Sequence, residues 1–166
     1  MGPPDRATGN TSPGTFPGVS SLCLLPDTWT LVSSGSDHTL RVWNLDSAEL
    51  VHHLHPHTLP VHGVALQPGK RRLPVIASIS DDRTVRLWQP TNGRMVRFIR
   101  LASKPLDVAW LTDGSRTVAV CQDGRVRLID PDRAKVTQNI PTLTGWAFAP
   151  AIHPPDHTMV VGGRSG

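Results

Sequence analysis

The sequence is poor in cysteine and contains no long apolar run. Only two of its 166 residues are cysteines, Cys23 and Cys121, which argues against a disulfide framework, and no C-x-x-C-H haem motif is present. Both cysteines lie in apolar, strand-like runs, where a free thiol behaves as a small hydrophobe. No segment approaches the roughly 18 apolar residues of a membrane-spanning helix. No apolar signal sequence follows Met1, so we expect a cytoplasmic location if Met1 is the native start.

A contiguous basic block is also missing, although the chain carries a net charge of +4 and has a pI near 9.8. Much of the excess is arginine spread at intervals, as at Arg41, Arg86 and Arg127. Proteins that bind nucleic acids tend to gather basic residues on one face. The dispersed pattern therefore favours an ordinary polar surface over a nucleic-acid interface.

No segment shows a sustained helical period of apolar residues. Instead, 16 prolines and 14 glycines separate short apolar runs, which is typical of an all-β protein. Residues 1–17 lack periodicity and are predicted to be a flexible lead-in. Turns are predicted at Pro26-Asp27 and Pro154-Pro155-Asp156, among others. The predicted strands are Ser20–Leu25, Thr30–Ser34, Thr39–Asn44, Glu49–Leu54, Val61–Leu66, Pro74–Ile79, Thr84–Gln89, Met95–Leu101, Leu106–Leu111, Arg116–Cys121, Arg125–Ile129, Lys135–Ile140, Trp146–Ile152 and Thr158–Gly163.

Two segments of the chain are nearly the same. Ser34–Trp43 reads SGSDHTLRVW and Ile79–Trp88 reads ISDDRTVRLW, so that the two tryptophans lie 45 residues apart. A more divergent third copy, Cys121–Ile129, places Ile129 at the tryptophan position, 41 residues after Trp88. A period of about 40–45 residues with this motif indicates stacked four-stranded units. A repeat of this kind typically supplies a binding platform.

These residues resemble the WD-repeat β-propeller family, over roughly Val19 to Gly166. The resemblance implies an all-β fold, a partial propeller of about three and a half four-stranded antiparallel blades, with third strands that can be apolar on both faces. It divides the chain into a lead-in, residues 1–17, and a propeller segment, residues 18–166. The blades are expected at about residues 18–55, 56–101, 102–141 and, in part, 142–166.

In this family each blade can hold a buried chain of hydrogen bonds from Asp to His to Ser to Trp. The resemblance assigns the complete set to His57, Ser78, Asp82 and Trp88. The first repeat keeps Ser33, Asp37 and Trp43 without a histidine, and the third keeps Asp123 alone. A closed network of this type would satisfy several buried polar groups together. We therefore expect one full network, one partial network and a third blade of lower rigidity.

Two other roles are conceivable for the histidines and their neighbours, a catalytic triad and a metal site. His57, Ser78 and Asp82 have the residue types of a catalytic triad, but no strained G-x-S-x-G turn exposes the serine, so an inert network is favoured. His53, His55 and His57 alternate as metal ligands on a strand can. However, Pro56 interrupts the strand, His57 belongs to the network, and no fixed carboxylate follows. We expect neither a metal nor a catalytic residue.

Gly162-Gly163 lacks the strand–glycine loop–helix setting of a dinucleotide site, so no cofactor is expected. The recurring arginine of each third strand (Arg41, Arg86, Arg127) is expected to serve the fold first.

The family resemblance implies a non-enzymatic scaffold that binds other proteins through loops on one propeller face. Here that face would comprise the turns at residues 36–38, 81–83 and 122–124 and the links 55–60, 101–105 and 141–145. His38, Arg83 and Lys104 are the expected exposed contact residues. The alternative is a sensor or scaffold segment of a larger protein whose catalytic domain lies outside this chain. Because propellers need at least four blades to close, we expect the remaining blades to come from a longer chain or from self-association.

Overall fold

The computed structural model describes residues 18–25, 28–55, 57–69, 72–142, 146–152 and 158–164, with only the backbone for residues 146–148. The predicted lead-in, the turns at Pro26-Asp27 and Pro154-Pro155-Asp156, and the strand break at Pro56 lie outside these residues. Within them the chain is built almost wholly of short β-strands. A single turn of 3₁₀ helix, η1 (Pro90–Asn92), is the exception, and it had not been predicted.

The strands form three antiparallel four-stranded sheets and one two-stranded sheet. Blade 1 contains β1 (Val19–Leu25), β2 (Thr30–Gly35), β3 (Leu40–Asn44) and β4 (Glu49–Leu54). Blade 2 contains β5 (Val61–Leu66), β6 (Ile76–Ser80), β7 (Thr84–Gln89) and β8 (Arg94–Arg100). Blade 3 contains β9 (Pro105–Trp110), β10 (Thr117–Cys121), β11 (Arg125–Asp130) and β12 (Lys135–Pro141), and β13 (Trp146–Ile152) pairs with β14 (Met159–Arg164). Each strand neighbours the next along the chain, which confirms the predicted partial propeller.

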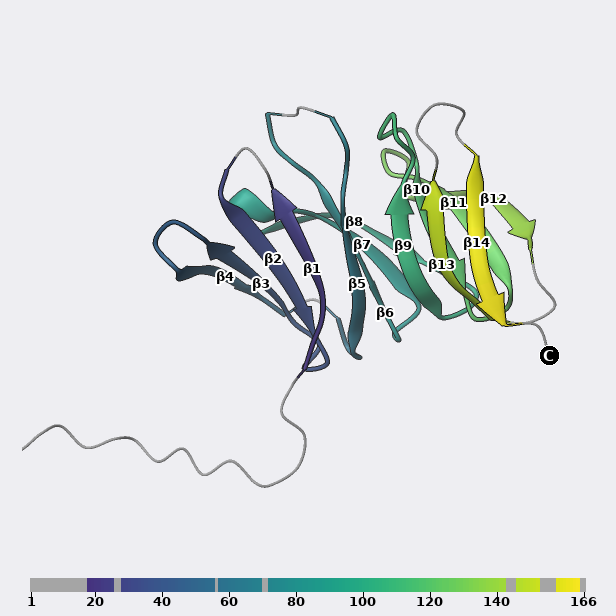
Figure 1. Ribbon diagram of the computed structural model, residues 1–166, viewed down its shortest axis with the longest axis horizontal. Helices are drawn as coiled ribbons and strands as arrows, with labels where there is room; N and C mark the ends of the chain where they lie inside the picture. The colour runs from purple at the N-terminus through teal and green to yellow at the C-terminus, as the bar shows by residue number, and fades with distance from the viewer. Residues whose placement is uncertain are drawn as a thin grey trace, which may run out of the picture.

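The blades stand side by side, and their first strands β1, β5, β9 and β13 form the inner row (Figure 1). An apolar core fills each seam between two blades. The seam of blades 2 and 3 is the most extensive and includes Ile79, Leu87 and Trp110. The third strand of blade 2 is buried on both faces, as expected, because a neighbouring blade covers each side: in β7, Val85 and Leu87 face blade 3, while Trp88 packs toward blade 1. In β3 of blade 1 only one face is buried, and Trp43 on the other face is half-buried.

Strand ends differ from prediction by one or two residues. The largest difference is at β6, which begins at Ile76 and not at Pro74. The last bond before it joins Gln67 N–H to the Val75 carbonyl at 2.8 Å. Strand β8 ends at Arg100, and the next residue, Leu101, donates its N–H to the Arg83 carbonyl at 2.8 Å.

Register shifts recur at the same places in every full blade. Each first strand carries one extra residue near its start, at Ser20, His62 and Leu106. Each fourth strand carries one beside the tryptophan position, at Val51, Val96 and Thr137. Such bulges increase strand twist and redirect a side chain, and His62 is redirected toward the turn described next.

Candidate interaction surface

The turns between the second and third strands of the three full blades have one common geometry. In each, the N–H of the third turn residue donates to the carbonyl of the last strand residue: His38 to Gly35, Arg83 to Ser80 and Gly124 to Cys121, at 3.0–3.2 Å. The third residue has a left-handed backbone, with φ of 70°, 61° and 70° respectively. This is a tight turn followed by a left-handed residue, a common connection in three-residue hairpins.

An aspartate precedes the left-handed residue in each turn and holds the turn from inside. The Oδ1 atom of Asp37, Asp82 or Asp123 accepts the backbone N–H two residues later, at 3.3, 3.1 and 3.3 Å. Aspartate is favoured at this position because its short carboxylate reaches its own backbone. The repeated Asp of the sequence motif is therefore a turn residue in all three blades.

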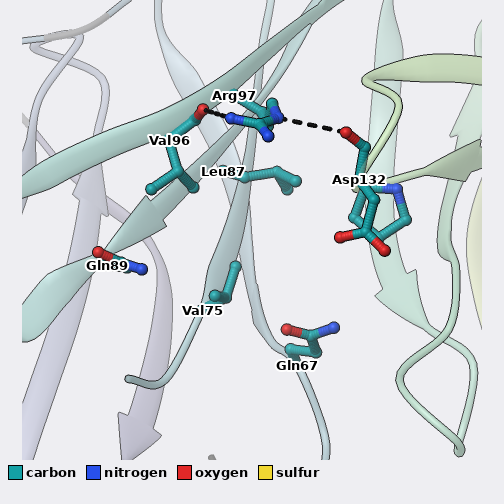
Figure 2. Close-up of a pocket in the computed structure, with 8 residues that line it drawn as sticks. Gln67, Val75, Leu87, Gln89, Val96, Arg97 and Asp132 are labelled. Carbon is teal, nitrogen blue, oxygen red and sulfur yellow. Dashed lines mark hydrogen bonds between the residues drawn. The ribbon is translucent and has the colours of Figure 1, made fainter. Parts of the chain in front are cut away.

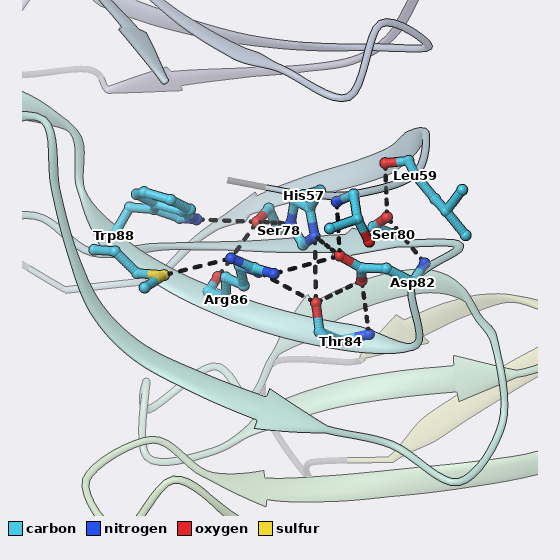
Figure 3. A network of polar contacts seen from close by, with 10 residues as sticks. His57, Leu59, Ser78, Ser80, Asp82, Thr84, Arg86 and Trp88 are labelled. Atoms are coloured by element: carbon cyan, nitrogen blue, oxygen red, sulfur yellow. Dashed lines mark hydrogen bonds and ion pairs between the residues drawn. The ribbon is translucent and has the colours of Figure 1, made fainter. Parts of the chain in front are cut away.

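In blade 2 a chain of buried hydrogen bonds starts from this aspartate (Figure 3). His57 Nδ1 lies 2.9 Å from Asp82 Oδ2, and His57 Nε2 lies 2.9 Å from Ser78 Oγ. The Trp88 indole N–H donates to the same Ser78 oxygen at 3.0 Å. The four residues expected to form a network thus lie together; that they stabilise the blade stays a prediction.

The bond directions are consistent with a neutral His57. Because the indole of Trp88 uses Ser78 Oγ as an acceptor, the single hydroxyl proton of Ser78 is free to donate to His57 Nε2. The Nδ1 proton then points to Asp82. Burial lowers the pKa of His57 below its ordinary 6.5, against the opposing effect of the Asp82 carboxylate. Burial alone would raise the pKa of Asp82, but hydrogen bonds from Thr84 and His57 lower it overall.

The other two blades contain less of this network. In blade 1 the Trp43 indole donates to Ser33 Oγ at 3.0 Å, and Asp37 pairs with Arg41 at 2.5 Å. Burial opposes ionisation there, yet hydrogen bonds from Arg41 and Thr39 lower the pKa of Asp37 to about 2. In blade 3, Ala119 and Ile129 replace serine and tryptophan, and the side chain that binds Asp123 is that of Arg127.

The recurring third-strand arginine pairs with the turn aspartate four residues earlier in every full blade. The distances are 2.5 Å for Asp37–Arg41, 3.5 Å for Asp82–Arg86 and 2.5 Å for Asp123–Arg127. The pair is loosest in blade 2, where His57 already binds the aspartate, and Arg86 instead lies over the Phe98 ring at 5.2 Å.

The arginine of the pair is most enclosed in blade 3. The Arg127 side chain is only 4% exposed and makes two hydrogen bonds to Asp123, at 2.9 and 2.5 Å. These bonds raise the pKa of Arg127 and lower that of Asp123. Of the network residues the third repeat keeps the aspartate alone, and its pair with Arg127 was not predicted.

A second polar cluster joins blades 2 and 3 at the same end of the strands. Asp81 accepts a short hydrogen bond from the bulge residue His62, and it pairs with Lys104 Nζ at 2.5 Å. Burial raises the pKa of Asp81, but Lys104 and His62 outweigh it, so the pKa lies below its usual range. Lys104 thus extends from the link into blade 3 to the turn of blade 2.

The three expected contact residues all belong to this end of the blades, which we call the turn rim. It comprises the turns 36–38, 81–83 and 122–124 with the first residues of the strands that follow them, and the described parts of the blade links. Arg83 is exposed. His38 and Lys104, expected to be exposed, are half-buried, and Lys104 is bound to Asp81.

The histidine cluster does not converge. The His53 and His55 rings contact each other, with centroids 4.0 Å apart, whereas the His57 side chain is fully buried in the network of blade 2. His52 lies against Gly93 and the Thr91 carbonyl. Among the described residues, no three His, Cys, Asp or Glu side chains are grouped as metal ligands.

A pocket of about 300 Å³ opens at the opposite end of the seam between blades 2 and 3 (Figure 2). Val75, Leu87 and Val96 supply its apolar wall, and Arg97 reaches across the seam to the Asp132 carbonyl at 3.4 Å. Both donors that Arg97 uses go to main-chain carbonyls. The pocket is separate from the turn rim.

Both cysteines are buried, and burial raises the pKa of each thiol to about 11. None of the described segments forms a helix of the length and hydrophobicity needed to cross a membrane.

Comparison with protein families finds the model "WD domain, G-beta repeat" at residues 9–44 and 48–89. The curated proteins similar to the chain include the B-type cell cycle switch protein ccs52B of Medicago truncatula, 30% identical over 138 residues (80% of this chain, 28% of that protein). They also include methylosome protein WDR77 of Xenopus laevis, 28% identical over 140 residues (79% of this chain, 41% of that protein). A third is coronin-7 of Rattus norvegicus, 30% identical over 109 residues (61% of this chain, 12% of that protein). The chain thus spans less than half the length of these relatives.

Proposed function

We propose that this chain, which belongs to the WD-repeat family, is a non-enzymatic module that binds other proteins through its turn rim. The observation that carries this proposal is the backbone at His38 and Arg83. Left-handed geometry costs a non-glycine residue roughly 1–2 kcal/mol, and Gly124 occupies the equivalent place in blade 3. Two side chains are therefore held at the rim in a conformation that glycine would adopt without strain.

Backbone strain of this kind is common where side chains serve recognition. Trp29, Ala48 and Ala134 share it at the opposite end of the blades, so it is the exposed charge of Arg83 that favours the rim. The rim is also rigid, since the turn aspartates, the His57 network and the Asp81 cluster fix its backbone. Binding residues are disproportionately found on loops that a rigid scaffold positions.

The geometry gives no support to a hydrolytic triad. Ser78 is completely buried, and both hydrogen bonds of its Oγ atom to side chains are internal to the blade. A nucleophile must reach its substrate. We therefore propose a structural role for His57, Ser78, Asp82 and Trp88, and for the partial sets Ser33, Asp37, Trp43 and Asp123.

The test is affinity capture with the tagged chain, followed by quantitative mass spectrometry. Three proteins are compared: the wild type, Arg83→Glu at the rim, and Arg94→Glu as the matched control. Arg94 is an exposed arginine at the far end of β8, and its side chain has no partner among the described residues. We expect a set of proteins captured by the wild type and by Arg94→Glu but lost with Arg83→Glu. A set that is unchanged by Arg83→Glu would contradict rim binding.

The second candidate, a scaffold segment of a larger protein with a catalytic domain elsewhere, is favoured by the length of the relatives, of which the chain spans 28%, 41% and 12%. Reading the coding sequence on both sides of these residues decides between the two.

The expected blade limits and a cytoplasmic location stay predictions.

We also propose that a further blade covers the outward face of blade 1. Leu22, Leu24 and Leu50 share this face with Trp43 and are 60%, 52% and 44% exposed. An apolar face of this kind is what neighbouring units bury in repeat proteins. The covering blade would come from a longer chain or from a second copy, and the molar mass in solution distinguishes a dimer from a monomer.

A further inference from the structure

The carboxylates of the turn rim are neutralised within the fold. Asp37 pairs with Arg41, Asp81 with Lys104, and Asp123 with Arg127, each at 2.5 Å. Asp82 is bound to His57 and, more loosely, to Arg86. These four are all the acidic residues of the three turns. A partner that approaches the rim therefore meets no free negative charge on the turns.

The cations that remain are Arg83 and Arg125, on adjacent blades. Both side chains are exposed. Their backbone N–H groups are used in the turns, by Ser80 and Asp123 respectively, whereas their guanidinium groups make no ion pair with any described residue. Each guanidinium thus retains its full set of donors for a carboxylate or a phosphate.

We propose that the rim binds an acidic peptide segment of a partner protein, through Arg83 and Arg125. This inference rests on the proposed function and names the chemistry of the partner. Arg83 sits at the strained left-handed position of its turn, and Arg125 begins β11 directly after Gly124. Both arginines therefore project from backbone that is fixed before binding, which reduces the ordering cost of the complex.

The composition of the rim favours a peptide over a nucleic acid. Proteins that hold single-stranded nucleic acids combine basic residues with aromatic side chains on which bases stack. The three turns carry no tryptophan, phenylalanine or tyrosine. The exposed Trp29, 69% accessible, lies in the turn between β1 and β2, at the other end of the blade.

The experiment measures fluorescence anisotropy of labelled probes titrated with the whole chain at low ionic strength. One probe is a short peptide of alternating Glu and Ser. A second has Gln in place of Glu, a third has phosphoserine with Gln, and a fourth is a single-stranded oligonucleotide. The proteins are the wild type, Arg83→Gln, Arg125→Gln, the double variant, and Arg94→Gln as control, each checked for an unchanged urea midpoint.

We expect the acidic peptides to bind and the Gln peptide not to bind. Each rim substitution should weaken binding by up to about fivefold, the upper range for an exposed charge pair, and added salt should weaken it further. Arg94→Gln should leave binding unchanged. Binding of the phosphoserine peptide alone supports the inference, with phosphate as the source of the charge.

Three results would overturn the inference: equal binding of the Gln and Glu peptides, an equal loss with Arg94→Gln, or preferential binding of the oligonucleotide. Failure here is distinguishable from failure of the proposed function. If Arg83→Glu abolishes capture of partner proteins while no anionic peptide binds, the rim remains the docking surface and only the acidic chemistry is wrong.

Discussion

Substitution of Ser78 by alanine tests whether the hydrogen-bond network of blade 2 stabilises the fold. Ser78 Oγ serves two buried partners, His57 Nε2 at 2.9 Å and the Trp88 indole at 3.0 Å. Alanine leaves both without a partner, and each unsatisfied buried group costs about 1–3 kcal/mol. Since the site is completely enclosed, we expect the free energy of unfolding to fall by about 2–4 kcal/mol.

The repeat itself supplies the matched control. Ser33 occupies the equivalent place in blade 1, but its Oγ has one indole partner, the half-buried Trp43, and no histidine. Water can reach this site, so Ser33→Ala should cost about 1 kcal/mol or less.

The assay is urea unfolding followed by tryptophan fluorescence. With a slope of about 2 kcal/mol/M, Ser78→Ala should lower the midpoint by about 1–2 M, and Ser33→Ala by about 0.5 M or less. Equal shifts for the two variants would refute the reasoning, because they would show that the histidine adds nothing to the network.

Three further predictions concern the direction in which the free energy of unfolding changes. Thr117 has a fully buried hydroxyl without a hydrogen-bond partner among the described residues. Thr117→Val should therefore raise the free energy of unfolding by about 1–3 kcal/mol. In the same urea assay the control Thr39→Val, which loses a 2.8 Å bond to Asp37, should lower the free energy of unfolding. Arg83→Gly should stabilise the chain by about 1 kcal/mol through relief of its left-handed backbone, and Gly124→Ala should destabilise it similarly. Burial holds the pKa of His57 in the folded chain below 6.5. As the pH falls below about 6.5, His57 therefore takes up a proton in the unfolded chain before it does so in the folded chain. The free energy of unfolding should decrease as the pH is lowered through this range. Urea midpoints between about pH 7.5 and 5 should therefore fall more in the wild type than in His57→Gln, and parallel curves would contradict the assignment.

The fold was predictable because its signal is repeated. The Asp of each turn and the Trp or Ile near the end of each third strand fix the period. The strands between them follow from turn residues and short apolar runs. Strand ends were less predictable, since residue types do not show where pairing stops, as at β6, which begins at Ile76 and not at Pro74. The single turn of 3₁₀ helix at Pro90–Asn92 is too short to show a period.

Two parts of the rim were missed for different reasons. The Asp–Arg pairs had a signal in the sequence, because arginine follows the turn aspartate by four residues in all three repeats. The cluster of His62, Asp81 and Lys104 had none. It depends on a bulge that redirects His62 and on the adjacency of two blades, and neither can be read from residue types.

The third blade shows how a repeat can diverge without losing its turn. Ala119 and Ile129 remove the hydroxyl and the indole, so a histidine would have no role there. The turn aspartate Asp123 is exposed, and the buried Arg127 binds it from the same hairpin with two hydrogen bonds. The ion pair is common to the three full blades, and in blade 2 the bond from His57 is added to it. Because Arg127 pairs with Asp123, the neighbouring exposed Arg125 keeps its charge for the proposed acidic partner.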